Sequence, residues 1–277
     1  MIDGLVLIGG GMAAGLFGSL LGLGGGILIV PLLTLVFNLP VLTAVGVSLI
    51  CVIVTSGAAA GVYLERHVAN LRLGMTLELF TAIGALVGGL VAFLLPERLL
   101  EVLFSALLLY VSATMLRRRD GGEQDAPAVL PDGSDPASTS ATGRSFESSL
   151  SGPDYRVRRL GFGLVGSVGA GVVSALLGIG GGLIKVPVMH VVMGVPLRVA
   201  TATSNLMIGI TASASAIIYL LRGGIDAYVA APTAIGVFLG ASLGSRIAHR
   251  IDLRILRGLF VVILLYTAWQ MLQRAAS

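Results

Sequence analysis

The chain has 277 residues, of which 56% are hydrophobic and only 12% charged, and its formal net charge is +4. Soluble domains carry about 25% charged residues, so this composition excludes a water-soluble globular protein of this size. The sequence contains no basic patch with interleaved aromatic residues, which argues against a nucleic-acid partner. The lipid bilayer is the expected environment, and the N-terminal apolar run is expected to be a retained membrane segment.

The apolar runs fall into two sets separated by a polar stretch. The first set covers about residues 5–21, 27–38, 41–64, 73–95 and 98–116, and the second covers about 160–177, 183–194, 197–221, 227–247 and 253–272. A helix needs about 20 residues to cross the hydrocarbon core, so the first two runs of each set are short. We expect a first membrane repeat at 1–117, a flexible linker at 118–156 and a second repeat at 157–277, because the linker is rich in Pro, Gly, Ser and Asp.

The two sets are copies of one another. Aligned without a gap, residues 18–66 and 174–222 share 18 identities in 49 positions, at a constant offset of 156 residues. The identities include prolines, a serine and a tyrosine, which chance matches between apolar segments do not readily align. Internal duplication of this kind is typical of secondary transporters.

The distribution of arginine favours five helical segments in each half. With the linker in the cytoplasm, five segments place 14 arginines on that side and three on the other, whereas four segments give 11 and six. An odd number inverts the second half relative to the first. The sequence therefore predicts an all-α polytopic membrane protein with about 8–10 transmembrane segments. Each of its two inverted-topology repeats has three full crossings plus a glycine-broken short pair.

The stretch SLLGLGGGILIVP at 19–31 and its copy ALLGIGGGLIKVP at 175–187 each contain three consecutive glycines. A glycine inside a helix costs roughly 1 kcal/mol relative to alanine, and helix packing needs one small residue per turn rather than three in a row. We therefore expect a helix break and a new helix whose free N–H groups bind an anion. The candidate ligands are Gly24, Gly25, Gly26, Gly180, Gly181 and Gly182. Helix packing alone is expected of Gly84, Gly88, Gly89, Gly240 and Gly244.

Lys185 is the only lysine in the chain, and its repeat partner is Ile29. Burying a lysine at the membrane centre costs about 2.5 kcal/mol or more, so we expect Lys185 to face a cavity or to be paired. Three residues after Gly182, its ammonium is placed to neutralise an oxyanion. The alternative is a side chain that extends to the membrane interface.

Hydroxyl and amide side chains supply further candidate ligands for sulfonate or carboxylate oxygens. The alternative for them is hydrogen bonding between helices or to the preceding turn. Glu78 could carry a coupling proton, but its position near a helix end favours ordinary solvation. The sequence shows no catalytic constellation and no metal-ligand spacing, so neither an enzyme nor a cofactor is expected. These candidate ligands are Ser48, Thr55, Ser204, Asn205 and Thr211.

The doubled phrase G-[LI]-G-G-G-x-x-x-V-P, followed by A-x-x-x-S at 44–48 and 200–204, resembles the sulfite exporter TauE/SafE family, also described as sulfonate-uptake-type permeases. The resemblance covers 5–116 and 160–272. It implies a bacterial-type plasma-membrane carrier of small sulfur-containing anions such as sulfite, thiosulfate or organosulfonates. The linker is longer than this family would suggest.

The leading hypothesis is therefore a secondary transporter that works by alternating access on a small anionic substrate. Two alternatives stay open: a membrane-embedded binding or scaffold subunit that recruits a partner through the linker, and a passive anion channel. Assembly into a homo-oligomer is also left open.

Overall fold

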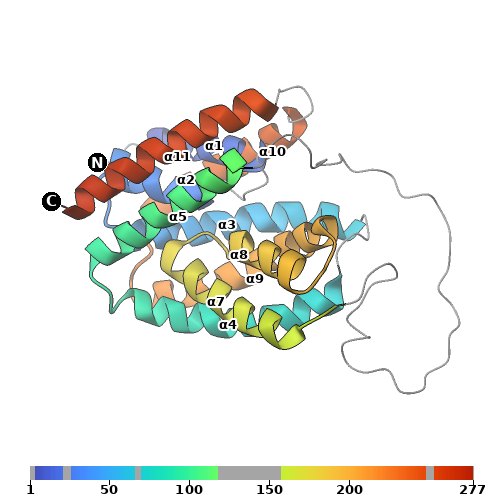
Figure 1. Cartoon of the computed structure of the whole chain (residues 1–277). Coiled ribbons are helices and arrows are strands. Elements are labelled where there is room, and N and C mark those ends of the chain that lie inside the picture. The colour runs from blue at the N-terminus through green and yellow to red at the C-terminus, as the bar shows by residue number, and fades with distance from the viewer. Residues whose placement is uncertain (1–3, 21–25, 66–69, 118–156, 248–252, 277) are drawn as a thin grey trace, which may run out of the picture.

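The computed structural model describes residues 4–20, 26–65, 70–117, 157–247 and 253–276, which form helices with no strand among them (Figure 1). The first half contains α1 (Gly4–Leu20), α2 (Gly26–Pro31) with a π-helical continuation η1 (Leu32–Val36), α3 (Val41–Glu65), α4 (Leu71–Ala92) and α5 (Glu97–Arg117). The second half contains α7 (Leu160–Leu177), α8 (Gly182–Pro187) with η2 (Val188–Val192), α9 (Leu197–Leu221), α10 (Ala227–Ile247) and α11 (Leu253–Ala276). The expected linker, 118–156, lies outside the described residues.

The helices repeat the duplication seen in the sequence. Every helix of the second half begins 156 residues after its counterpart in the first. Helix α1 packs on α10, and α4 packs on α7. Because α1 corresponds to α7 and α10 to α4, these are two copies of one contact, each made between the halves. The pairs α3–α9 and α5–α11 bring counterparts into direct contact, so a pseudo-two-fold axis relates the halves, and the halves interlock.

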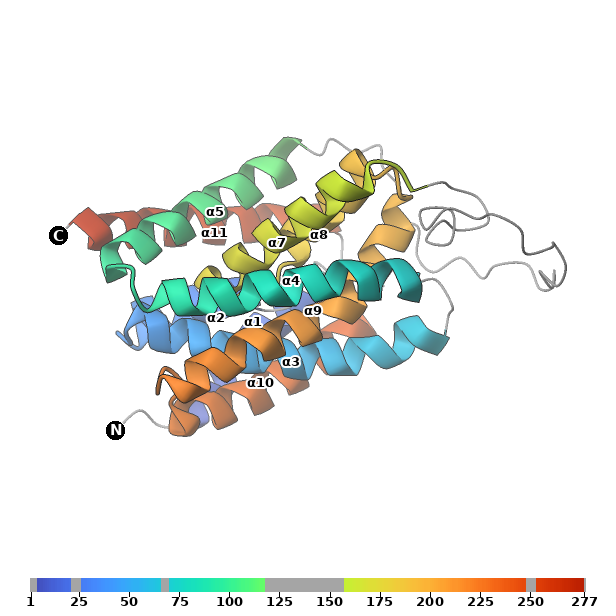
Figure 2. The ribbon, with the colours of Figure 1, turned by 90° about the horizontal axis from the view of Figure 1, so that it is seen from below.

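The two halves have inverted topology. Gly46, near the start of α3, lies against Gly224, just after the end of α9, since a Cβ at Gly46 would be 2.4 Å from the Gly224 carbonyl oxygen. Further along α3, the Ser56 hydroxyl donates to the Asn205 carbonyl at 3.3 Å. The counterpart helices α3 and α9 therefore run antiparallel. The start of α1 and the end of α11 lie at the same end of the bundle, as Figure 2 shows.

The position of the pseudo-axis follows from the same contact. A Cβ at Gly209 of α9 would be 2.7 Å from the Ser56 hydroxyl oxygen, and the repeat partner of Gly209 is Ile53. A residue lies opposite its own counterpart only where the axis passes. Gly209 lies opposite Ser56, which is three residues from its counterpart Ile53, so the axis passes between these positions, near residues 53–56 of α3 and 209–212 of α9. In an inverted repeat this axis lies in the membrane plane, which puts that part of α9 near the middle of the membrane.

The short segment of each half folds back on the helix before it. A Cβ at Gly10 of α1 would be 3.0 Å from the Leu32 side chain, and a Cβ at Gly166 of α7 would be 3.0 Å from Val188. The 11 residues 26–36 span about 16 Å at 1.5 Å per residue, about half of the 30 Å hydrocarbon core. The pair α1–α2 therefore forms a helical hairpin whose second arm, residues 26–36, is too short to cross the membrane. Six helices among the described residues are long and apolar enough to cross a membrane: α4, α5, α7, α9, α10 and α11.

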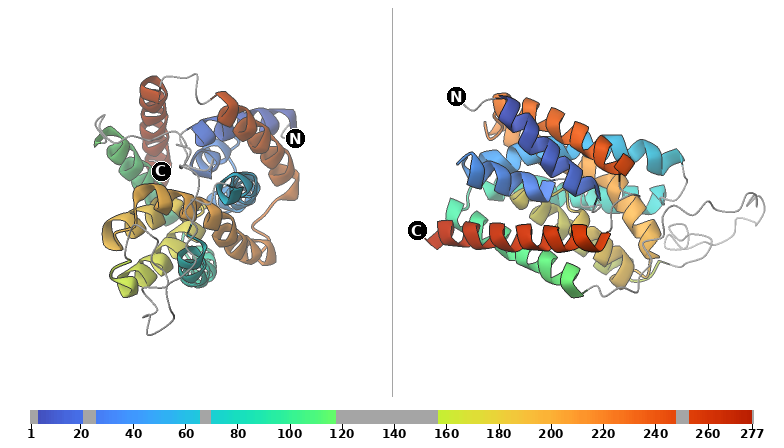
Figure 3. Two further views of the ribbon diagram at one scale, coloured as in Figure 1. Left: turned by 90° about the vertical axis from the view of Figure 1, so that its right-hand side faces the viewer. Right: turned by 90° about the horizontal axis from the view of Figure 1, so that it is seen from above.

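Glycine allows the helices of the two halves to approach closely. A Cβ at Gly84 would lie 2.1 Å from the Val168 carbonyl oxygen, and one at Gly240 would lie 2.0 Å from that of Met12. Neither distance accommodates a side chain, so α4–α7 and α1–α10 meet backbone to backbone, as the views in Figure 3 show from the side and along the bundle. The packing role predicted for Gly84 and Gly240 is confirmed, and close backbone approach also occurs at Gly88 and Gly244. At Gly89 the nearest contact of an added Cβ would be the Ile218 side chain, at 3.1 Å.

Candidate functional site

The second glycine segment forms the predicted helix break. Helix α7 ends at Leu177, and Gly178, Gly180 and Gly181 all have positive φ, between 68° and 77°. An L-residue with a side chain pays a steric penalty in this region, whereas glycine does not. The break then leads into the short helix α8. In the first half, Gly24 and Gly25 lie outside the described residues, and Gly26 is the buried first residue of α2.

Ser48 of α3 joins the second break to the start of α2. Its hydroxyl lies 2.7 Å from the Gly178 carbonyl oxygen and 3.1 Å from the Gly26 carbonyl oxygen. A Cβ at Gly26 would also be 2.9 Å from the Gly178 carbonyl oxygen. A hydroxyl has one proton to donate, so two carbonyls from opposite halves compete for it. The second break and the start of α2 therefore meet at one serine, in a contact that depends on Gly26 having no side chain.

The second break is also where two buried hydroxyls lack a partner. Neither the Ser174 nor the Ser204 hydroxyl has a hydrogen-bond partner in the described part of the chain, and both residues are 1% exposed or less. Cβ atoms built at Gly181 and Gly182 would lie 3.7 Å from the Ser174 oxygen and 3.5 Å from the Ser204 oxygen, respectively. Buried polar atoms are nearly always satisfied, so two orphans at one glycine segment indicate a place for a ligand or water.

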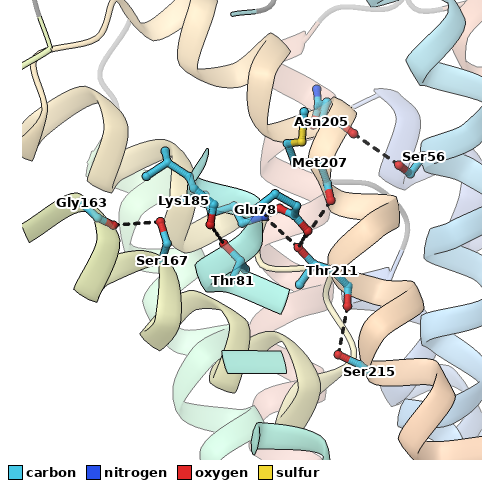
Figure 4. A network of polar contacts seen from close by, with 11 residues as sticks. Ser56, Glu78, Thr81, Gly163, Ser167, Lys185, Asn205, Met207, Thr211 and Ser215 are labelled. Carbon is cyan, nitrogen blue, oxygen red and sulfur yellow. Dashed lines mark hydrogen bonds and ion pairs between the residues drawn. The ribbon is translucent and has the colours of Figure 1, made fainter. Parts of the chain in front are cut away.

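Lys185 is paired, which is one of the two outcomes that the sequence allowed. Its ammonium forms an ion pair with the Glu78 carboxylate of α4 and donates to the Thr211 hydroxyl of α9 at 2.8 Å. Thr211 in turn donates to the second carboxylate oxygen of Glu78 at 2.6 Å. Figure 4 shows the three side chains pointing toward one another from three helices. Since Thr211 lies in the part of α9 crossed by the pseudo-axis, this triad sits near the middle of the membrane.

The prediction that Glu78 is an ordinary solvated carboxylate is wrong. Glu78 is 4% exposed, Lys185 3% and Thr211 not at all. Helix α4 begins at Leu71, so Glu78 lies seven residues, or about 10 Å, inside it. An acidic residue two turns inside an apolar run marks a functional position in a membrane protein, and that depth is the signal the sequence offered. The sequence gives no such signal for Ser174, because its repeat partner is Gly18 and the hydroxyl is therefore not repeated in the first half.

A cavity of about 10 Å³ lies beside the triad, which is room for about one water molecule. Gly74 forms part of the wall, where an added Cβ would be 2.8 Å from the Met207 side chain. The cavity thus brings the fixed cation, the buried acid and an orphan hydroxyl together. Its described lining is Gly74, Leu77, Glu78, Lys185, Met189, Thr203, Ser204 and Met207.

Two predicted ligands do not line this cavity. The Thr55 hydroxyl bonds the carbonyls of Cys51 and Val52 in its own helix, both at 3.1 Å. The backbone carbonyl of Asn205 accepts from Ser56, and the described lining of the cavity includes neither Asn205 nor Thr55. Of the hydroxyl candidates, the structure brings Ser204 and Thr211 to Lys185, and places Ser48 where the second break meets the start of α2.

The charged triad exists in one copy only. The repeat partners of Lys185, Glu78 and Thr211 are Ile29, Ala234 and Thr55. Ile29 and Ala234 are buried apolar residues. The pseudo-symmetric backbone therefore carries one asymmetric polar centre, formed between α4 of the first half and α8 and α9 of the second.

Inverted repeats, paired helix breaks and a buried polar centre near the membrane middle define a multi-pass membrane protein of the transporter class. The family described as "Sulfite exporter TauE/SafE" matches residues 7–271. Because the match covers nearly the whole chain, the protein belongs to this family.

The relatives that match the chain are all named as probable membrane transporter proteins. The chain is 24% identical over 277 residues to "Probable membrane transporter protein YunE" of Bacillus subtilis, covering 97% of each chain. It is 25% identical over 236 residues to "Probable membrane transporter protein YdhB" of the same organism, covering 85% of this chain and 86% of the relative. "Probable membrane transporter protein MamO" of Paramagnetospirillum magneticum is 24% identical over 98% of this chain, which spans 44% of that relative. No solved structure matches. The family and these names indicate a membrane transporter and not an enzyme.

Proposed function

We propose that the protein is a secondary transporter that moves small sulfur-containing anions, such as sulfite, thiosulfate or organosulfonates, across the plasma membrane by alternating access. In this proposal the anion binds at the second glycine break, between Lys185 and Ser204, and the linker lies in the cytoplasm. Both the family description and the relatives' names are consistent with transport. The choice of a sulfur-containing anion depends on the family description.

The observation that carries the proposal is the shared cavity of Lys185 and Ser204. The Lys185 ammonium supplies a fixed positive charge, and the orphan Ser204 hydroxyl supplies a donor that no described residue uses. A tetrahedral oxyanion presents several acceptor oxygens, which suits one cation and one or two hydroxyl donors.

The size of the cavity supports movement between states. A space for one water molecule does not hold a sulfur oxyanion, so an anion reaches Lys185 only after α4 separates from α8 or α9. These helices belong to different halves, since α4 lies in the first and α8 and α9 in the second. A movement of one repeat against the other would therefore open the site, as alternating access requires.

The test is uptake of sulfite, thiosulfate and a short alkanesulfonate into proteoliposomes containing the purified protein. K185M removes the fixed charge, and losing a charged hydrogen bond costs about 1.5–3 kcal/mol, so uptake at low anion concentration should fall about 10- to 100-fold. R274M is the matched control. Arg274 is paired with Glu101 across α11 and α5 at 3.4 Å and is not among the cavity lining, so its removal should leave anion selectivity unchanged.

The outcomes separate the alternatives. Uptake that saturates and is accelerated by unlabelled anion on the opposite side indicates a carrier, whereas flux without such counterflow indicates a channel. If K185M moves every tested anion at the wild-type rate, Lys185 has no role in anion binding. If the wild-type protein moves none of them, the substrate class is wrong.

A further inference from the structure

We propose that Glu78 is the proton-binding group of this transporter, and that one proton enters with each anion because the anion and the Glu78 carboxylate compete for Lys185. This inference rests on the proposed function. It identifies the coupling ion as the proton.

An anion can pair with the Lys185 ammonium only by replacing the Glu78 carboxylate. In the structure Lys185 is already neutralised, because its ammonium is paired with Glu78 and bonded to Thr211. Thr211 holds the second carboxylate oxygen, so all three polar groups satisfy one another. An incoming anion that takes the ammonium must displace the carboxylate of Glu78, which is the group that already occupies the anion position.

Among the described residues, the helices packed around Glu78 offer a displaced carboxylate no other counter-charge nearby. Helix α7, which packs on α4, contains no ionisable residue over its whole length. On α9, the ionisable residues are Arg198, 13 residues or about 20 Å along the helix from Thr211, and Tyr219, whose hydroxyl bonds the Ala175 carbonyl. On α4 itself Arg72 precedes Glu78 by six residues. After Lys185, the next ionisable residue of the short segment is His190, whose ring bonds the Val195 carbonyl and which is exposed.

Protonation resolves this conflict. An unpaired buried charge is strongly unfavourable, and a group in that position neutralises instead. A proton from water forms an O–H bond on the Glu78 carboxylate, the protonated acid keeps its contact with Thr211, and Lys185 stays an ammonium. When the anion leaves on the other side, the proton leaves with it and the Lys185–Glu78 pair forms again.

The charge balance fixes the stoichiometry. The empty site holds one ammonium and one carboxylate. The loaded site holds the ammonium, the anion and a neutral acid. A monovalent sulfonate therefore crosses with one proton and carries no net charge, whereas divalent thiosulfate crosses with one proton and carries one negative charge. The membrane potential should thus affect the transport of thiosulfate and leave that of the sulfonate unchanged.

The structure also provides a matched control carboxylate. Glu101 of α5 is, like Glu78, 4% exposed and paired with a cation, Arg274. Its partner is an arginine, which stays charged in proteins and also bonds the Thr34 carbonyl at 2.5 Å. Glu101 is not in the cavity lining. E101Q therefore removes a buried membrane acid without touching the anion route.

The experiment measures two quantities on wild type, E78Q and E101Q. The first is accumulation of a short alkanesulfonate in proteoliposomes with a pH difference imposed across the membrane. This anion stays ionised from weakly acidic to weakly alkaline pH, so only the protein can respond. A difference of about one pH unit, acid outside, should give about tenfold accumulation in wild type and E101Q, and none in E78Q. The second is proton uptake on adding the same anion to the detergent-purified protein in weak buffer, with about one proton per bound anion expected in wild type and E101Q.

Each result has a consequence. Anion binding or counterflow in wild type without proton uptake, or a pH response that survives in E78Q, overturns the role of Glu78 and leaves the proposed transporter standing. A pH response that is lost equally in E101Q and E78Q also overturns the role of Glu78, because removing either buried acid would then have the same effect. Absence of anion binding in wild type overturns the proposed function and this inference together. Thermal unfolding of all three proteins shows whether E78Q is folded, and proton uptake by K185M/E78Q, which removes both charges, should be zero.

Discussion

Separating Lys185 from Glu78 by mutation measures how strongly the buried pair holds α8 to α4. Both side chains are at most 5% exposed, so solvent cannot replace a lost partner. Breaking a buried ion pair on one side typically costs about 3–5 kcal/mol, because the other charge stays buried and uncompensated. We expect K185M to lose this amount, and E78Q to lose less, because the glutamine carbonyl still accepts a hydrogen bond.

Thermal unfolding of the purified protein in detergent provides the measurement. For a chain of about this length, 1 kcal/mol shifts the midpoint by about 2–4 °C, so K185M should unfold on the order of 10 °C below wild type. Its deficit should shrink at lower pH, because a proton then neutralises the orphaned carboxylate. The double variant K185M/E78Q carries no buried charge and should regain most of the loss, with a coupling free energy of about 2–3 kcal/mol.

The control is the other buried pair. E101Q removes the carboxylate that pairs with Arg274, and because the Arg274 side chain is 34% exposed, water can hydrate its charge. The loss in E101Q should therefore be clearly smaller than the loss in E78Q, which leaves the buried Lys185 unpaired. If K185M is as stable as wild type, or if the double variant loses the sum of the two single losses, the two side chains do not form a buried pair and the reasoning from the triad fails.

Two further predictions concern backbone contacts. G84A should destabilise the protein strongly, or prevent its accumulation in the membrane, because its Cβ would lie 2.1 Å from the Val168 carbonyl oxygen. The control G161A, whose Cβ would have no atom within 4 Å, should be neutral or slightly stabilising. The measurements are the yield of folded protein and its unfolding midpoint. S48A should cost about 1–3 kcal/mol, because it leaves the Gly178 and Gly26 carbonyls without their shared donor. S213A removes a hydroxyl bonded only within its own helix at 2.7 Å and should change the unfolding midpoint little; equal losses in the two serine variants would refute the bridging role.

The sequence predicts the inverted repeats because both signals for them extend over the whole chain and depend on no single contact. The 156-residue offset recurs at every helix start, and the arginine distribution depends only on which side each loop lies. The path of the short segments is different. Whether residues 26–36 cross or return depends on the contact of Leu32 with Gly10, and a contact between two apolar side chains leaves no distinctive pattern in an apolar sequence.

The candidate site is predicted in part for a related reason. Lys185 stands out because it is the only lysine, and Ser204 because its copy, Ser48, is also a serine. The distance of Glu78 from the end of an apolar run does not show that it is paired, because its partner is 107 residues away in the chain. An ion pair of this kind becomes visible only when the fold brings α4 against α8 and α9.

The asymmetry between the copies has a physical reason in the cost of buried charge. A lysine at position 29 would face a site where the repeat partner of Glu78 is Ala234, so it would be buried without a counter-charge, at about 2.5 kcal/mol or more. A glutamate at 234 without a lysine at 29 would be equally unfavourable. The two charges are therefore stable only together, and a copy carries both or neither. Since the second break meets the start of α2 at Ser48, one polar centre close to the pseudo-axis is enough for a site that both halves enclose. In the proposed mechanism this makes the pair, rather than the lysine alone, the unit that an anion and a proton must open.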